Sequence, residues 1–140
     1  LAASGRLMTR SQVIWVIKRG IKSIITIRET PLNEKWFEGC EGVEYRHLQV
    51  EDYGAPTMNQ LIDIIEYILT KVRNEKPVIV HCNGGTGRTG TILSAYLMKS
   101  QNLSAEQVME EVERIRGRRP RRKKQLRILA EYERLLASQG

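Results

Sequence analysis

The sequence predicts an α/β domain with a central, mostly parallel, twisted sheet of four to five strands flanked by helices. Two observations support this class. Short β-branched runs alternate along the chain with longer segments whose apolar residues recur at helical spacing, and the chain then ends in a helical tail. No internal repeat or low-complexity linker interrupts the 140 residues. We therefore expect one domain, residues 1–140, that buries about two thirds of its unfolded surface.

The strands are expected to be short and mostly buried. The segment 22–28 (KSIITIR) is rich in β-branched residues, and 43–50 (VEYRHLQV) alternates less regularly. An opening strand is expected within residues 1–7, and the apolar run Val78–Val80 predicts a buried strand over 77–81.

Helix boundaries are indicated by capping residues. A first helix is expected to begin at Thr9 or Ser11 and to end at Gly20. Thr57 with Gln60 forms a capping box for a second helix, which carries the clearest apolar stripe of the chain. Between these helices, Trp36 and Phe37 are expected to cover the core.

Two further helices are expected in the tail. Ser104 and Gln107 form another capping box after a turn at Asn102, and Gly117 lies near the end of the helix that follows. A last helix begins at about Lys123. The apolar residues of these two helices are expected to face inward, and they are Val108, Val112, Ile115, Leu126, Leu129 and Leu136.

Residues 77–91 (PVIVHCNGGTGRTGT) contain the most informative pattern. A buried strand runs into a glycine-bearing loop, and the loop opens a helix whose apolar spacing begins near Arg88. Such a loop points successive backbone N–H groups inward, and the helix N-terminus adds partial positive charge. The pattern therefore predicts an anion-binding loop with a cysteine at its start and an arginine at its end.

Two nucleotide-binding interpretations of this loop fail. Gly85, Gly87 and Gly90 satisfy G-x-G-x-x-G, but a dinucleotide fold also needs a second strand ending in an acidic residue about 20 positions later. The sequence there is helical instead. A Walker-type loop fails because no glycine is followed by Lys-Ser or Lys-Thr at the required spacing.

Taken whole, residues 81–90 resemble the signature HCxxGxxRTG of the cysteine-dependent protein phosphatases, specifically the small atypical dual-specificity type. The resemblance extends over nearly the whole chain and implies a protein-tyrosine-phosphatase-like fold. It implies that Cys82 is the nucleophile and that the Thr89 hydroxyl donates a hydrogen bond to the thiolate. The phosphate-binding loop that it implies comprises Asn83, Gly84, Gly85, Thr86, Gly87 and Arg88.

The chemistry explains why these residues stand at this spacing. The thiolate is the reactive form of cysteine, and loop amides, a helix N-terminus and a nearby arginine all favour the anion of Cys82. The same groups can bind the three outer oxygens of a phosphoryl group, with the planar fork of Arg88 making two parallel hydrogen bonds. A lysine would lack that fork. His81 is expected to orient the loop and not to act as a base.

A leaving oxygen needs a proton, so the resemblance also requires a general acid. The family places an aspartate about thirty residues before the nucleophile, and Asp52 in the loop 51–56 (EDYGAP) matches it. Glu51 is the alternative. Gln125 aligns with a glutamine that positions water in related enzymes, but the family pattern RPGSxxTxEQ is not kept in residues 116–125, so an exposed polar residue is an equal interpretation.

The expected activity is phosphomonoester hydrolysis through a phosphocysteine, most simply by a protein-tyrosine or dual-specificity phosphatase. An RNA 5′-phosphatase, a phosphoinositide phosphatase and a non-catalytic phosphate-binding module are the alternatives. The mechanism needs no cofactor, and with few His and Cys no metal site is visible. The expected partner is a phosphorylated protein or another phosphomonoester, and we expect a monomer.

The cysteines and the length of the apolar runs indicate the cellular compartment in which the protein is expected. A disulfide between the two cysteines, Cys40 and Cys82, would consume the nucleophile, so a reducing compartment, the cytoplasm, is expected. No run reaches the ~18 apolar residues of a membrane span, and no signal peptide is visible.

The net charge of +7 is concentrated in one basic stripe, residues 114–127. It holds nine of the 23 Lys and Arg and no acid, and the remaining 14 basic and 16 acidic residues give the rest of the chain a net charge of −2. Such a stripe would attract polyanions such as acidic phosphopeptides, phosphoinositides or RNA. A solvated charged face is the alternative. The stripe lacks aromatic residues for stacking on bases, which weakens the RNA interpretation.

Overall fold

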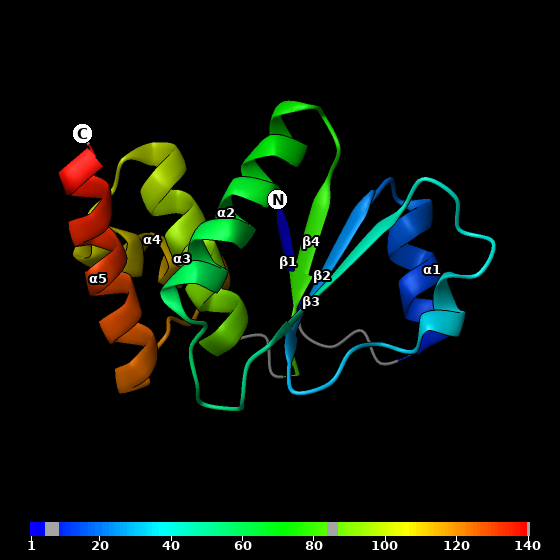
Figure 1. Cartoon of the computed structure of the whole chain (residues 1–140), viewed down its shortest axis with the longest axis horizontal. Coiled ribbons are helices and arrows are strands. Elements are labelled where there is room, and N and C mark those ends of the chain that lie inside the picture. The colour runs from blue at the N-terminus through cyan, green and yellow to red at the C-terminus, as the bar shows by residue number, and fades with distance from the viewer. Residues whose placement is uncertain (5–8, 84–86, 140) are drawn as a thin grey trace.

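A four-stranded parallel sheet forms the centre of the computed structural model, which describes residues 1–4, 9–83 and 87–139 (Figure 1). The strand order is β1-β4-β2-β3, and each neighbouring pair is parallel. The strands are β1 (Ala2–Ser4), β2 (Ser23–Arg28), β3 (Glu44–Gln49) and β4 (Val78–His81). The predicted α/β class and parallel sheet are confirmed, with four strands. The opening strand is shorter than the predicted range 1–7, whose last residues lie outside the described part.

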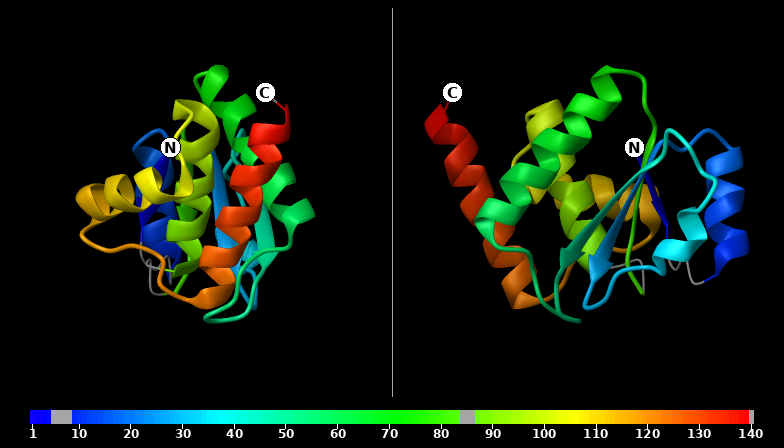
Figure 2. Two further views of the ribbon diagram at one scale, coloured as in Figure 1. Left: turned by 90° about the vertical axis from the view of Figure 1, so that its left-hand side faces the viewer. Right: turned by 45° about the vertical axis from the view of Figure 1, so that its right-hand side comes forward.

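Helices cover both faces of this sheet (Figures 1 and 2). One face carries α1 with the short 3₁₀ helix η1, and the other carries α2, α3, α4 and α5. The helices are α1 (Arg10–Lys18), η1 (Glu34–Phe37), α2 (Met58–Arg73), α3 (Gly87–Gln101), α4 (Ala105–Arg116) and α5 (Lys123–Gln139).

Three of the helices begin at capping boxes. The N-caps of α1, α2 and α4 are Thr9, Thr57 and Ser104, and in each case the residue three positions later is a glutamine that completes the box. Each box satisfies two backbone N–H groups that the helix itself cannot pair. The predicted helix starts are therefore confirmed, with Thr9 and not Ser11 as the first cap.

Successive residues of the central strands supply two separate cores. Ile25 of β2 and Val80 of β4 are register partners and belong to the larger core beneath α2–α5. Ile24 and Ile79 are also register partners, but they belong to the smaller core under α1 and η1. Alternation along a strand sends neighbouring side chains to opposite faces, which explains this division. Trp36 and Phe37 pack against the smaller core, as predicted.

Two apolar residues that were expected to face inward are exposed. Ile115 is 53 % exposed because the core contacts of α4 come from Val108, Met109 and Val112, and its last turn lies beyond the core cluster. Leu126 is 42 % exposed because α5 turns Gln125 inward in its first turn. Adjacent residues of a helix are about 100° apart around its axis, so Leu126 points in a different direction from the buried Gln125.

Parallel strands place their carboxyl ends at the same edge of the sheet, which is where open α/β sheets bind ligands. Here the residues that follow β2, β3 and β4 share that edge, namely Glu29, the loop 50–57 and the loop that opens α3. Within the described ranges, no helix is long and apolar enough to cross a membrane.

Candidate active site

A cleft of about 590 Å³ lies at the carboxyl edge of the sheet. It collects side chains from three distant parts of the chain: the loop after β3, the junction of β4 with α3, and the segment that joins α4 to α5. Its lining residues are Asp52, Tyr53, Cys82, Gly87, Arg88, Arg118, Arg119, Arg121, Arg122 and Gln125. A cleft of this size accommodates a whole small ligand and not only a single phosphate ion.

Cys82 follows the last residue of β4 and lies at the buried end of the cleft. The residue is 2 % exposed overall and lines the cleft wall. Neither cysteine forms a disulfide, and Cys40 is not among the residues that line the cleft.

Arg88, in the first turn of α3, is held by two acceptors from other strand ends. Its Nη1 donates to Glu29 Oε1 at 2.6 Å and to the Val50 carbonyl oxygen at 2.9 Å. The side chain is only 4 % exposed. A guanidinium has five N–H donors, so two contacts through Nη1 fix its orientation and leave Nη2 and Nε to bind an anion.

Glu29 is a site residue that the sequence analysis missed. A hydrogen bond from its own backbone lowers the pKa of the Glu29 carboxyl, desolvation opposes that shift, and the charge of Arg88 lowers it further. The carboxyl therefore stays ionised beside the guanidinium. No motif marks Glu29, but an acid directly after a buried strand, at the edge where the anion loop lies, is a signal that could have found it.

Asp52 lies beside Arg88 and lines the cleft, whereas the alternative acid Glu51 is not among the lining residues. Asp52 Oδ1 is 3.7 Å from Arg88 Nη2, and the Asp52 side chain is 64 % exposed at the mouth of the cleft. Glu51 does not line the cleft, and its carbonyl oxygen closes a turn with the N–H of Gly54. A side chain at Gly54 would place its Cβ 2.9 Å from that carbonyl oxygen, so this turn requires glycine.

Gln125 is buried against both functional loops, so the interpretation of an exposed polar residue is wrong. It is 1 % exposed, and its Nε2 donates to the Gly54 carbonyl oxygen at 3.0 Å. A Cβ added to Gly87 would lie 2.7 Å from the same nitrogen. Gln125 Oε1 has no hydrogen-bond partner among the described residues. Its capacity to accept a hydrogen bond therefore remains unused in this part of the cleft wall.

The structure describes some of the other residues predicted around the phosphate-binding loop, namely Thr89 and Asn83. The Thr89 side chain is fully buried, and its hydroxyl has no hydrogen-bond partner within residues 1–4, 9–83 and 87–139. Asn83 Oδ1 accepts from Arg28 Nη1 at 3.1 Å, so an arginine at the end of β2 holds the start of the loop. The predicted phosphate-binding residues Gly84, Gly85 and Thr86 lie outside the described part of the chain.

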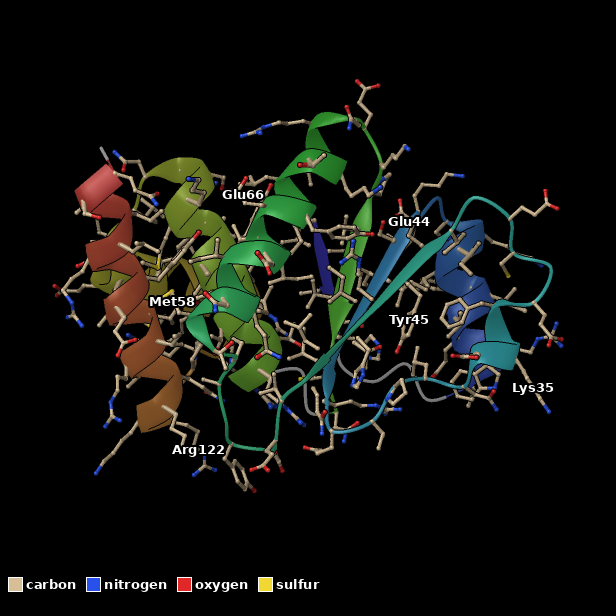
Figure 3. All side chains as sticks on the ribbon, viewed as in Figure 1. Lys35, Glu44, Tyr45, Met58, Glu66 and Arg122 are labelled. Atoms are coloured by element: carbon tan, nitrogen blue, oxygen red, sulfur yellow. The ribbon has the colours of Figure 1, made fainter. Side chains whose placement is uncertain are left out.

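The basic stripe also reaches the cleft, which the sequence pattern did not reveal. Four of its arginines line the cleft. One of them is Arg122, which Figure 3 labels, and its guanidinium carbon lies 3.9 Å from the centroid of the Tyr53 ring. Burial lowers the pKa of Arg116, and its interaction with a thiolate at Cys82 would oppose that shift.

His81 is a buried neutral residue beneath the loop. Thr26 and His81 are register partners, and Thr26 Oγ1 forms a hydrogen bond with His81 Nε2 at 2.7 Å. Burial, followed by the positive charge of Arg28, lowers the pKa of His81 to about 4. A histidine that stays neutral at physiological pH and lies 1 % exposed fits the predicted orienting role.

We expect His81 to make the fold acid-sensitive. The unfolded state binds the proton near pH 6.5 and the folded state only near pH 4, so stability is lost as pH falls through this window. Between pH 7.0 and 5.5 the free energy of unfolding should fall by about 1 kcal/mol from this residue. Urea unfolding at both pH values measures the difference, and His81→Gln should reduce it. An unchanged pH slope in this variant would contradict the assignment.

Comparison with known proteins gives a family match over nearly the whole chain. Residues 1–133 match the family described as "Swiss Army Knife protein, DSP-PTPase phosphatase domain". The rat protein "Phosphatidylglycerophosphatase and protein-tyrosine phosphatase 1" is 31 % identical over 140 residues, which cover 96 % of this chain and 72 % of the rat protein. An uncharacterised protein of Methanocaldococcus jannaschii is 40 % identical over 72 residues, a match that spans only 46 % of this chain and 45 % of that protein.

Solved structures agree with this match. The structure of Tk-PTP in its active form has a TM-score of 0.84 and 31 % identity, and the alignment covers 96 % of this chain and 92 % of that one. PTPMT1 also has a TM-score of 0.84, with 25 % identity over 99 % of this chain and 93 % of its own.

Proposed function

This chain belongs to the Swiss Army Knife DSP-PTPase phosphatase-domain family, and from that premise we propose that it hydrolyses phosphomonoesters through a phosphocysteine intermediate. One observation carries the proposal. Cys82, Arg88 and Asp52, which are a nucleophile, an anion binder and an acid, line the same cleft although Asp52 comes from a different strand end. A phosphate-binding module without turnover would need neither the cysteine nor the acid.

In the first step the Cys82 thiolate attacks phosphorus from the side opposite the leaving oxygen. The S–P bond forms as the P–O bond breaks, and Asp52 gives its proton to the departing oxygen. Arg88 and the loop amides bind the three outer phosphoryl oxygens, where negative charge must be stabilised. Glu29 and the Val50 carbonyl hold the guanidinium in place, which avoids reorganisation during the reaction.

In the second step a water attacks the phosphocysteine. Asp52, now ionised, accepts a proton from that water, the S–P bond breaks, and inorganic phosphate and the thiolate are released. We infer that Gln125 orients this water, because it lines the cleft between Gly54 and Gly87 and its Oε1 has no hydrogen-bond partner among the described residues. The Thr89 hydroxyl, which also has no partner in the described part of the chain, is suited to stabilise the departing thiolate.

Both protein and non-protein substrates are consistent with the family. Its description names the dual-specificity phosphatases, which supports phosphorylated tyrosine, serine or threonine, whereas the name of the rat relative includes phosphatidylglycerophosphatase. To compare these substrate classes, turnover is measured on phosphotyrosine and phosphoserine peptides, on 5′-triphosphate RNA and on lipid phosphates.

We place the activity in a reducing compartment, the cytoplasm, because a thiolate nucleophile must not be oxidised.

The proposed reaction is tested by hydrolysis of 4-nitrophenyl phosphate in the presence of EDTA. Phosphate release should continue in the chelator, and acid quenching within the first turnover should trap phosphate on a peptide that contains Cys82. Phosphate found on any other residue, or on none while product accumulates, would overturn the phosphocysteine mechanism.

Asp52→Asn should slow the reaction most for substrates with poor leaving groups. A general acid contributes typically 10²–10⁴-fold, and its contribution grows as the leaving group becomes more basic. We expect kcat to fall about 100-fold or more for an alkyl phosphate and much less for 4-nitrophenyl phosphate. A series of aryl and alkyl phosphates measures this dependence.

The matched control for this prediction is Glu51→Gln. Glu51 is the neighbouring acid, and it does not line the cleft, so its removal should leave the leaving-group dependence as in the wild type. If Glu51→Gln produced the steeper dependence and Asp52→Asn did not, the acid would be Glu51.

A further inference from the structure

We propose that the segment between α4 and α5 forms a second anion site in the active-site cleft, so that the substrate is a small molecule with a second phosphate that is not hydrolysed. The inference rests on the proposed function, because it assumes that the first phosphate is bound at Cys82 and Arg88. Its main residues are Arg118, Arg121 and Arg122, with Tyr53 on the facing loop.

The cleft contains more positive charge than one phosphate needs. Five arginines line it, and Asp52 is the single acidic residue among its lining residues. Arg88 already has Glu29 as a partner, and Arg119 forms an ion pair with Glu113. Among the described residues, Arg118 and Arg121 form no ion pair. These two guanidiniums are therefore available to an incoming anion beside the catalytic one.

The arginine segment is fixed against the catalytic helix. A Cβ added to Gly90 in the first turn of α3 would lie 3.3 Å from Pro120 Cγ, so the two segments are in close contact there. Pro120 is buried, and the ion pair of Arg119 with Glu113 anchors the segment to α4. The second anion site would thus sit at a set distance from Cys82, which is what recognition of two phosphates on one scaffold requires.

The loop 51–56, which carries Asp52 and Tyr53, contacts the same arginine segment. Arg122 stacks on Tyr53, and Gln125 donates to the Gly54 carbonyl oxygen, so the acid loop and the arginine segment are connected by two contacts. An anion bound by the arginines would lie beside the loop that carries Asp52. Charged groups that line a cleft also raise the local concentration of an oppositely charged ligand.

The cleft lining favours a polar bisphosphate over a phosphotyrosine side chain. Tyr53 is the single aromatic residue among the lining residues, and the guanidinium of Arg122 covers one face of its ring at 3.9 Å. No second aromatic residue among the lining residues offers a surface for a phenyl ring. In contrast, Gln125 Oε1, which has no partner among the described residues, can accept a hydrogen bond from a hydroxyl group on the scaffold.

The test compares propane-1,3-diyl bisphosphate with 3-hydroxypropyl phosphate, which differ only in the second phosphate. For the wild type, we expect kcat/KM for phosphate release to be about tenfold or more higher for the bisphosphate, since charge-assisted hydrogen bonds to a second phosphate are gained. In the double variant Arg118→Gln/Arg121→Gln, the ratio of the two values should fall toward one.

A matched control removes two charges of the same stripe outside the cleft. Lys123 and Lys124 do not line it, so Lys123→Gln/Lys124→Gln should keep the wild-type ratio. Isothermal titration of the bisphosphate into the Cys82→Ser variant, with and without the two arginine substitutions, gives the affinity difference independently of turnover.

Each contrary outcome has a distinct meaning. Equal kcat/KM for both compounds in an enzyme that hydrolyses 4-nitrophenyl phosphate would overturn the second anion site and leave the proposed function intact. An equal loss in the lysine control would assign the effect to the general field of the stripe. A gain seen with a doubly phosphorylated peptide and not with the small bisphosphate would also overturn the proposal. Failure to hydrolyse any phosphomonoester would instead contradict the proposed function.

Discussion

Cys82→Ser is expected to abolish hydrolysis of 4-nitrophenyl phosphate, with kcat reduced roughly 10⁴-fold or more. A serine hydroxyl is far less ionised than a thiol at neutral pH, and Asp52, the acidic residue among the described lining residues, must be protonated in this first step. Phosphate binding should survive, because Arg88 and its partners Glu29 and Val50 are unchanged. The measurement is steady-state turnover together with titration of inorganic phosphate.

The chain offers a matched control for this result. Cys40 is the other cysteine of the chain, it is partly exposed, and it does not line the cleft. Cys40→Ser makes the same chemical change outside the site and should retain wild-type kcat. Wild-type turnover in Cys82→Ser would move the nucleophile elsewhere, and a large loss in Cys40→Ser would show that the two cysteines are functionally coupled.

The second large effect is expected for Arg88→Lys, which should lower kcat/KM roughly 10²–10³-fold while keeping the positive charge. Lysine has no planar fork, so it cannot bind two phosphoryl oxygens in parallel while also contacting Glu29 and the Val50 carbonyl oxygen. The loss should appear in kcat as well as in KM, because the arginine stabilises charge that shifts between oxygens in the transition state.

Arg114→Lys is the control for this second prediction. Arg114 is 71 % exposed on α4 and forms an ion pair with Glu111, and exposed pairs of this kind contribute little to stability. Thermal unfolding of both variants separates loss of function from loss of fold. A value of kcat/KM for Arg88→Lys within a factor of three of the wild type would show that a point charge is sufficient at this position.

Much of the architecture could be predicted because it depends on residues that are close in sequence. The capping boxes at Thr9, Thr57 and Ser104 each join residues three positions apart, and the structure has all three. The β2 strand follows from its β-branched composition. Burial on the last two helices was predicted less well. Ile115 and Leu126 continue the apolar spacing, but which helical face is buried depends on where neighbouring elements end, and no local pattern contains that information.

The sequence by itself determined the pair that we propose to be catalytic. Cys82 and Arg88 are six positions apart at a strand–loop–helix junction, and so short a loop brings them together in any fold that forms the strand and the helix. Tertiary structure alone decided how the pair is supported. Glu29 and Val50 reach Arg88 across 59 and 38 residues, and Gln125 reaches Gly54 across 71. Such contacts depend on the order of parallel strands and on the packing of α5 against the acid loop, because only the assembled sheet brings those segments to one edge.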